Sequence, residues 1–171
     1  MSANTQEELQ ALAARAMAAS KEVLTLRLGA EEYGIDILRV QEIRSFEQPT
    51  RIAGAPPHVL GVTNLRGAIV PIVDLRCRFG LQAAYGSGTV TVVLAVAGRT
   101  VGAVVDAVSD VVTLTPAHLK PAPEIGGAAD TAHITGIATQ GEGDAVRLLI
   151  LLDIEALMTG SEMGLAAATV H

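Results

Sequence analysis

The residue best suited to nucleophilic chemistry is Cys77, the only cysteine in the chain. It stands between Arg76 and Arg78, and neighbouring arginines can lower the pKa of a thiol and so favour the reactive thiolate. His58 lies upstream as a candidate base. A small cysteine hydrolase is therefore one hypothesis. The alternative is structural, because one Cys and one His outside a shared motif are common, and Cys77 also suits a small apolar position in a short helix.

Other residue types that support chemistry lack the necessary spacing. The histidines, His58, His118, His133 and His171, are scattered over loops and the tail, and none has a His or Cys partner at the spacing of zinc ligands. Gly126-Gly127 is not followed by the Lys-Ser/Thr of a phosphate-binding loop. No pair of acids is placed by spacing alone in an apolar cleft. We therefore expect no catalytic residue, no metal site and no cofactor.

The composition excludes several classes of protein. Eighteen acids against twelve Lys and Arg give a formal net charge of −6, which argues against nucleic-acid binding because that requires a basic patch. The longest apolar runs, such as 90–97 and 148–152, are shorter than the ~18 residues that span a bilayer, so direct membrane insertion is not expected. The N-terminus lacks a secretion signal and a single cysteine allows no internal disulfide, which predicts a cytoplasmic protein.

An internal repeat organises the elements that must position any site. The segment 33–43 aligns without a gap with 101–111, an offset of 68 positions at which Gly34 meets Gly102. In each half, a glycine-bounded hairpin follows and ends at an aspartate. Repeats of this kind indicate two like subdomains. The groove between them is the first place to expect a binding site.

Apolar residues alternate with a period of two along much of the chain from Val23 onward, which predicts about ten short strands. Arg66-Gly67 is predicted to be a hairpin turn, with Gly where a positive φ is most easily tolerated. The fold class we expect is all-β, with short helices and with each half closing into a small five-stranded barrel.

The domain organisation predicted is a flexible or helical leader over 1–21, a single domain over 22–158 and a flexible tail over 159–171. The apolar face of the leader is mostly alanine and would bury little surface. Within the domain, the subdomain halves are expected at approximately 22–80 and 88–158. The assignment of the N-terminal strand to one barrel or the other stays open, because a terminal strand can cross over.

Two charged residues stand within otherwise apolar segments. Glu42 lies between Val40 and Ile43, and Arg66 follows the apolar run that leads to its turn. Taken singly, each is expected to be solvated, since charged side chains are mostly exposed. The alternative is that they form a charge pair beside an apolar groove and fix the register of a docked partner.

Three segments together resemble the CheW family, the coupling proteins of bacterial chemotaxis. They are Val-Thr-Asn-Leu-Arg-Gly-Ala-Ile-Val-Pro-Ile-Val-Asp-Leu-Arg (62–76), Glu-Glu-Tyr-Gly-Ile-Asp-Ile-Leu-Arg-Val-Gln-Glu-Ile-Arg (31–44) and Val-Val-Asp-Ala-Val-Ser-Asp-Val (104–111). The likeness runs from about Val23 to Leu157. It implies two SH3-like five-stranded barrels packed side by side. It also implies a non-catalytic adaptor that bridges the cytoplasmic tip of a chemoreceptor and the regulatory domain of the histidine kinase CheA, recruited to membrane-associated receptor arrays.

The resemblance also assigns roles to residues. Glu42 and Arg66 match the glutamate and arginine that matter for receptor coupling in the family, and this replaces the expectation that each is merely solvated. Val40, Ile43 and Val108 would line the receptor-binding groove. Gly61 and the strand edges near it are weaker candidates for contact with the kinase. An adaptor of the same fold in another pathway, such as motility or development, is the alternative, because surface residues choose the partner.

Overall fold

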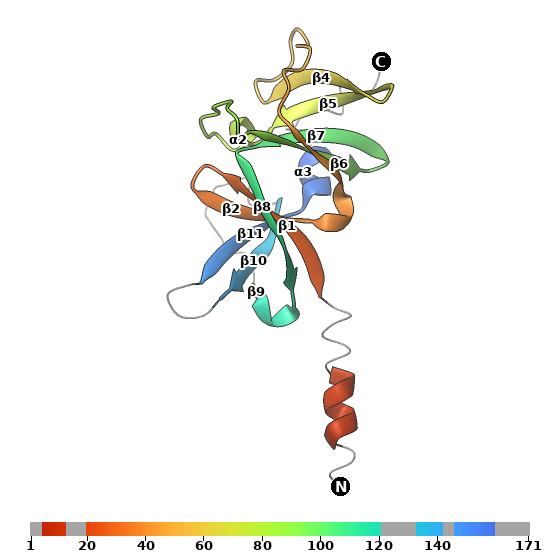
Figure 1. Cartoon of the computed structure of the whole chain (residues 1–171), viewed down its shortest axis with the longest axis vertical. Helices are drawn as coiled ribbons and strands as arrows, with labels where there is room; N and C mark the ends of the chain where they lie inside the picture. The colour runs from red at the N-terminus through yellow and green to blue at the C-terminus, as the bar shows by residue number, and fades with distance from the viewer. Residues whose placement is uncertain (1–4, 13–19, 121–132, 142–145, 160–171) are drawn as a thin grey trace.

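The computed structural model of the chain describes residues 5–12, 20–120, 133–141 and 146–159. These residues form two strongly curved β-sheets, one of six strands and one of five, which pack against each other as two lobes (Figure 1). The predicted fold class, all-β with two small barrels side by side and short helices, is confirmed, but one sheet has six strands where five were expected in each.

The six-stranded lobe combines the start of the domain with its C-terminal part. Its central strands are a hairpin from the beginning of the domain and a hairpin from its end, joined by a short parallel pairing. The strand order is β8-β1-β2-β11-β10-β9. The strands are β1 (Lys21–Leu28), β2 (Glu31–Asp36), β8 (Ala107–Leu114), β9 (Leu119–Lys120), β10 (Ile134–Gln140) and β11 (Arg147–Leu152).

The five-stranded lobe is contiguous in the sequence and follows the same plan, with the order β3-β6-β7-β5-β4. Again two hairpins meet through a parallel pairing, here between β5 and β7. Its strands are β3 (Val40–Ser45), β4 (Val59–Leu65), β5 (Ala68–Asp74), β6 (Val90–Val96) and β7 (Arg99–Val105). The short helices are η1 (Ile37–Arg39), α2 (Leu75–Arg78), η2 (Pro116–His118) and α3 (Ile154–Thr159).

The two lobes exchange their leading hairpins. The hairpin β1–β2 pairs with β8 and β11, whereas β6–β7 pairs with β3 and β5. The predicted subdomain halves, 22–80 and 88–158, therefore correspond to the two repeats of the sequence and do not correspond to the two sheets. The physical reason is that the chain crosses to the other lobe after each leading hairpin. This crossing also answers the question that the sequence left open about the N-terminal strand.

The aligned glycines of the repeat, Gly34 and Gly102, have the same structural role in the two lobes. Gly34 in β2 pairs with Leu151 of the parallel neighbour β11, and Gly102 in β7 pairs with Ile72 of β5. A Cβ atom at Gly34 would lie 3.0 Å from a Leu151 methyl carbon, and one at Gly102 would lie 2.5 Å from a methyl carbon of Ile72. Each glycine therefore makes room for a large side chain where two parallel strands meet.

The largest hydrophobic cluster is made by both lobes together. Leu26 and Ile35 come from the six-stranded lobe, Leu94 and Val105 from the five-stranded lobe, and Leu157 from α3, and all are buried. Each such side chain contributes about 2 kcal/mol of burial free energy. The boundary between the lobes is thus filled by core side chains. Half-buried side chains packed against this core, among them Val40 and Val108, form its rim.

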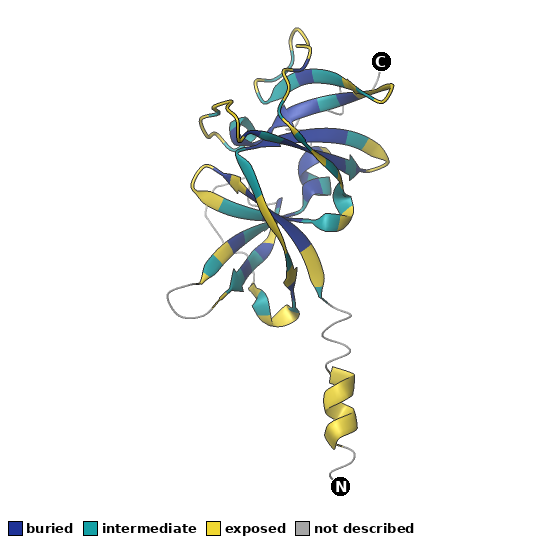
Figure 2. Cartoon of the chain, in the orientation of Figure 1, coloured by how far each residue is buried: buried dark blue, intermediate teal, exposed yellow. Residues whose placement is uncertain are grey.

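The ends of the domain differ in what the structure describes. Residues 5–12 form a helix in which every residue is exposed (Figure 2), including Leu9 and Leu12. This agrees with an expectation that the leader buries little surface. Beyond Thr159, the predicted tail lies outside the described residues.

Candidate functional site: a charge pair at the rim of the interlobe core

Glu42 and Arg66, which are 24 positions apart in the sequence, form an ion pair. Arg66 Nη2 lies 2.6 Å from Glu42 Oε2, and Arg44 Nη1 lies 2.9 Å from Glu42 Oε1. The side chain of Glu42 is 22% exposed, whereas that of Arg66 is 82% exposed. The hydrogen bond from Arg44, together with the charge of Arg66, lowers the pKa of Glu42. The carboxylate is therefore fixed and ionised, and Arg66 projects into solvent as the outer half of the pair.

The local sequence fixes the position of Arg66. Leu65 pairs with Ala68, so that Arg66-Gly67 is a two-residue hairpin loop. Both loop residues have positive φ, +52° at Arg66 and +89° at Gly67, as the tight turns that match the twist of a hairpin require. The Asn64 side chain accepts a hydrogen bond from the Gly67 N–H at 2.9 Å. The predicted turn is present, and it holds Arg66 in a conformation uncommon for a residue with a side chain.

A bulge in β3 orients the neighbours of Glu42. Val40 pairs with Leu94, and Ile43 pairs with Val92. The two pairs are three residues apart along β3 but only two residues apart along β6, so β3 carries one extra residue. Val40 and Ile43 therefore lie on one face of the strand, and Glu42 lies on the other. Val40 packs against the interlobe core, while Ile43 is 47% exposed. The bulge thus allows one short strand to present an apolar side chain and a charge pair at the same edge.

Val108 lies on the other lobe, in β8 opposite Leu26. It is half-buried and packs against the same interlobe core as Val40. The structure therefore places the five sequence-predicted receptor residues in two groups. Glu42 and Arg66 are in direct contact, and Val40 and Val108 approach one core from opposite lobes, with Ile43 exposed beside Val40.

Gly61, the weaker candidate for kinase contact, has a structural role. Its φ is +146°, and a Cβ atom there would lie 1.9 Å from the carbonyl oxygen of Thr50. The approach is close because Thr50 and Val62 exchange two backbone hydrogen bonds of 2.8 Å, which fasten the loop before β4 to that strand. Any other residue at Gly61 would displace this loop, so Gly61 can affect a partner indirectly by shaping the surface around it.

The sequence interpretation missed an equivalent charge pair on the other lobe. Asp110 in β8 meets Arg147 at the start of β11, with Arg147 Nη2 3.4 Å from Asp110 Oδ1 and 2.6 Å from Glu32 Oε2. The Thr25 hydroxyl donates a hydrogen bond to the Asp110 carboxylate. That bond, followed by the one from Arg147, lowers the pKa of Asp110. In each lobe, an acid on the strand that follows the crossing between lobes, β3 or β8, thus pairs with an arginine of the lobe's last hairpin, β4–β5 or β10–β11.

The internal repeat contained the information needed to find this second pair. At the offset of 68 positions, Glu42 is aligned with Asp110, and Ile43 with Val111. Ile43 and Val111 are exposed to nearly the same extent, 47% and 49%. An arginine near the last hairpin of the second half was therefore the missing partner to look for.

The second feature that sequence reasoning missed is a buried charged network around Arg76. This side chain is completely buried, with Nη2 3.0 Å from Asp74 Oδ2 and Nη1 2.9 Å from Asp106 Oδ1. The Tyr85 hydroxyl donates to Asp74 at 2.6 Å, and the Arg76 guanidinium lies 4.9 Å from the Tyr85 ring centroid. Burial opposes the charge of Arg76, but the hydrogen bonds that it donates to Asp74 and Asp106 outweigh this effect and raise the pKa of Arg76. Asp106 also accepts from the Gly29 N–H at 2.7 Å, which connects α2 to the β1–β2 turn.

The environment of Cys77 contradicts the hydrolase hypothesis. Burial and the nearby Asp74 carboxylate raise the pKa of the Cys77 thiol, and the opposing effect of Arg76 is smaller. Arg76 does not activate the thiol as the hydrolase hypothesis requires, because it is already neutralised by two carboxylates, and the structural alternative is favoured. Cys77 is a half-buried thiol in α2 that favours the protonated, unreactive form.

Two further properties bear on function. In the part of the chain that the structure describes, no group of three or more His, Cys, Asp or Glu side chains could hold a metal ion. Of the helices in the same residues, none is both long and apolar enough to cross a membrane.

The fold and site together define a protein of two paired SH3-like barrels that presents a charge pair beside an apolar rim. The family model of the CheW-like domain matches residues 22–162, and the chain belongs to this family. The chain is 52% identical to the chemotaxis protein CheW of Klebsiella aerogenes over 146 aligned residues. The alignment covers 85% of this chain and 86% of that protein. It is 32% identical to the chemotaxis protein CheW of Bacillus subtilis, over 81% of this chain and 86% of the relative.

A solved structure agrees with this assignment. The crystal structure of the scaffolding protein TtCheW from Thermoanaerobacter tengcongensis matches with a TM-score of 0.73 at 29% identity, over 83% of this chain and 94% of that one. The prediction of a non-catalytic adaptor of the CheW type is confirmed by this family membership.

Proposed function

We propose that this protein couples the cytoplasmic tip of a chemoreceptor to the regulatory domain of the histidine kinase CheA, in the cytoplasm at membrane-associated receptor arrays. One observation carries the proposal: Glu42 and Arg66 form a fixed ion pair at the rim of the interlobe core, in a chain 52% identical to a chemotaxis protein CheW.

The geometry supports a helix docking against the rim. Val40, Ile43 and Val108 would cover an apolar stripe of the helical receptor tip, which corresponds to the helix-in-groove mode of recognition. Burial there would supply the affinity at about 25 cal/mol per Å². The Glu42–Arg66 pair would set orientation and register, because charged groups at an interface discriminate between alignments. Arg66 keeps 82% of its side chain exposed while it contacts Glu42, so its outer side would meet an acid on the receptor.

The kinase would use a different surface. β4 is the last strand in the order of the five-stranded sheet, and an open strand edge favours pairing with a like-folded domain. The loop before β4 occupies this edge at one point, the Thr50–Val62 bridge, and the rest of the edge would meet the kinase. Gly61 would therefore act on kinase binding by permitting that bridge, and each small contact would gain avidity from array assembly.

The test is a binding titration of the purified protein against a soluble receptor-tip fragment. Wild type is compared with Arg66→Ala and with Arg27→Ala, a control that removes an exposed arginine from β1. We expect saturable binding that Arg66→Ala weakens and Arg27→Ala does not, with circular dichroism spectra unchanged. If Arg66→Ala unfolds the protein, Arg66 is structural and the site assignment fails. If the wild type does not bind, partners in another signalling pathway must be sought.

A further inference from the structure

The rim of the interlobe core has the same apolar arrangement on both lobes. At the repeat offset of 68 positions, Val108 and Val111 on β8 correspond to Val40 and Ile43 on β3. Both strands carry a bulge between the two positions. In each strand, the first side chain packs against the core and the second is about half exposed. A helix with an apolar stripe would therefore find equivalent apolar contacts in either direction, and these contacts cannot decide which way round it docks.

The charged groups beside the rim are not equivalent. On the five-stranded lobe, Arg44 and Arg66 both contact the single carboxylate of Glu42, at 2.9 and 2.6 Å. The two arginine side chains are 40% and 82% exposed. Glu47 acts on Arg44 through its charge, without a hydrogen bond to it. Two cations thus share one anion in direct contact, and this end of the rim is positive.

On the six-stranded lobe the balance is reversed. Arg147 is the shared cation, 2.6 Å from Glu32 and 3.4 Å from Asp110. The side chain of Asp110 is 50% exposed and that of Glu32 is 32% exposed, so both can be reached from solvent. Two anions thus share one cation, and this end of the rim is negative.

The internal repeat traces the difference to two positions. At the same offset, Arg44 of β3 corresponds to Val112 of β8, and Glu32 of β2 corresponds to Thr100 of β7. Each lobe therefore has one charged residue where the other lobe has an uncharged one. The two charges have opposite signs, so the rim is apolar throughout but carries opposite charge at its two ends.

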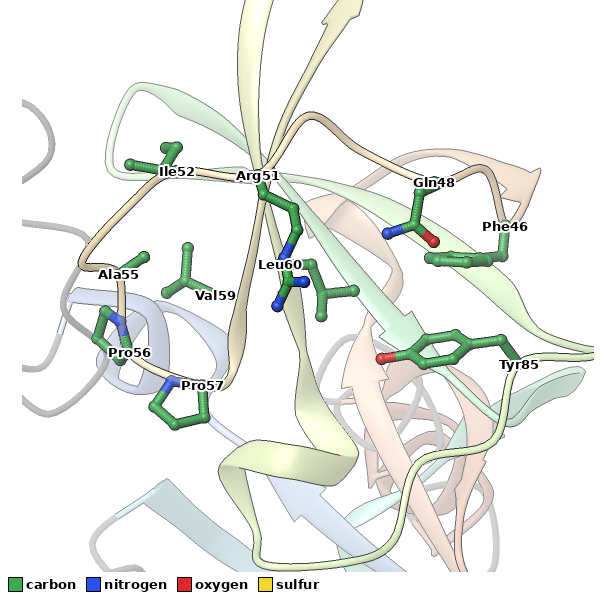
Figure 3. Close-up of a pocket in the computed structure, with 10 residues that line it drawn as sticks. All are labelled: Phe46, Gln48, Arg51, Ile52, Ala55, Pro56, Pro57, Val59, Leu60 and Tyr85. Carbon is green, nitrogen blue, oxygen red and sulfur yellow. The ribbon is translucent and has the colours of Figure 1, made fainter.

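Both charged ends are held in place before a partner arrives. The buried Thr25 hydroxyl donates to the Asp110 carboxylate and accepts from the Asp110 N–H at 3.0 Å. At the other end, Figure 3 shows Phe46, the residue after β3, facing Tyr85. Their rings stack with centroids 4.7 Å apart, which anchors the end of the strand. Little ordering entropy would therefore oppose the use of these charges in binding.

We propose that the opposite charges of the two lobes fix the direction of a helix docked on the rim. The occupant is an amphipathic helix with an acid at one end of its apolar stripe and a base at the other. The acid lies at Arg44 and Arg66, and the base lies at Glu32 and Asp110. The reversed helix would bring like charges together at both ends, which is how an interface rejects an alignment that its apolar contacts allow. The inference rests on the proposed function only in taking a helix as the occupant.

The test reads the direction of a bound helix directly. The probe is one acetylated and amidated peptide with glutamates in its first turn, leucines along one face and lysines in its last turn, an order that also suits the helix dipole. A nitroxide is attached at its first residue in one preparation and at its last residue in the other. In ¹H–¹⁵N spectra of the full chain, the first label should broaden the amides of 65–67 and the second those of 109–111. We expect one direction to be favoured about tenfold, as two solvent-exposed charge pairs allow.

The repeat supplies matched variants, because each charged residue can be replaced by its uncharged equivalent. Arg44→Val combined with Glu32→Thr makes the two ends alike, and each label should then broaden the amides of both lobes to the same extent. The control is Arg99→Val combined with Glu31→Thr, which removes one exposed cation and one exposed anion outside these clusters. The control should keep the direction found in wild type. Spectra of both proteins without peptide should match wild type away from the substitutions.

Three results would overturn the inference. They are equal broadening of both lobes by either label in wild type, a direction that persists when the two ends are made alike, and an absence of saturable shifts at the rim amides. The peptide contains no receptor sequence, so its result is separate from the receptor titration. A directed peptide without receptor binding would refute the proposed function alone. Receptor binding together with an undirected peptide would refute this inference alone.

Discussion

Arg76 and Asp106 join the two lobes by a partly buried ion pair, with Arg76 Nη1 2.9 Å from Asp106 Oδ1. Arg76 belongs to α2, which lies between β5 and β6 of the five-stranded lobe, and Asp106 stands at the point where the chain crosses to the six-stranded lobe. The backbone of Asp106 is fastened as well, because its N–H donates to the Arg27 carbonyl at 3.1 Å. A single arginine thus stabilises the point where the chain crosses between the lobes. A change in the angle between the lobes at this point would alter the surfaces to which both lobes contribute.

Removing Arg76 should strongly destabilise the protein. Arg76→Ala leaves the Asp74 carboxylate buried without its counter-charge, and breaking a buried pair in this way typically costs about 3–5 kcal/mol. The measurement is the free energy of unfolding in urea. Arg39→Ala is the control, since Arg39 pairs with Glu155 at the surface, where loss costs about 0–1 kcal/mol. Equal effects of the two substitutions would show that the network does not stabilise the fold.

Acid should destabilise the folded state through Asp106 and Asp110. Burial would raise the pKa of Asp106, but the hydrogen bonds from Gly29 and Arg76 outweigh it and lower the pKa; the bonds from Thr25 and Arg147 lower that of Asp110. Because these carboxyls bind protons less readily when folded, the unfolded state takes up more protons as the pH falls through about 4. Their contribution is therefore complete above about pH 5 and is lost progressively below it.

This pH dependence can be assigned to one residue. In urea unfolding measured between pH 7 and pH 3.5, wild type should lose stability as the pH falls, and Asp110→Asn should lose less over the same interval. At pH 7 the variant should be the less stable of the two, because it lacks the charge that Arg147 contacts. Parallel curves for the two proteins would mean that Asp110 has the same pKa folded and unfolded.

Substitution of Gly61 should act on the loop before β4. In Gly61→Ala, strain at the positive φ costs about 1–3 kcal/mol, and the new Cβ atom meets the Thr50 carbonyl at 1.9 Å. Hydrogen exchange should show that the Val62 amide loses protection as the bridge opens. Gly54→Ala is the matched control, because Gly54 also has a positive φ, +80°, but no atom lies within 4 Å of its added Cβ. If Val62 stays protected in Gly61→Ala, the close approach has been relieved without opening the loop.

Cys77 should react slowly with thiol reagents. Its raised pKa leaves less thiolate at neutral pH than an ordinary cysteine has, so its reaction with a disulfide reagent at pH 7.5 should be slower than that of the same protein in urea. Cys77→Ala should retain binding to the receptor-tip fragment. A rapid native reaction together with loss of binding would restore a chemical role for this residue.

Much of the local structure and the first charge pair could be predicted from the sequence. Strands and turns could be predicted because period-two alternation and turn glycines involve residues that are close in the sequence. The pairing of Glu42 with Arg66 was one of two interpretations that the sequence allowed. The exchange of hairpins could not be predicted, because the pattern of a strand does not specify which lobe it joins. Nor could the burial of Arg76, since one of its two acids, Asp106, is 30 positions away and an arginine in a short helix is usually exposed.

The exchange of leading hairpins also bears on how such a chain can arise and be divided. A gene for one repeat alone would encode a leading hairpin that has no sheet to join. It would also encode the outer strands of a sheet whose central hairpin is missing. Two copies of that product could complete each other by trading hairpins, which is the arrangement of a domain-swapped dimer. The present chain has the connectivity of such a dimer fused end to end. Cutting it between the repeats should therefore yield two fragments that fold only when they are together.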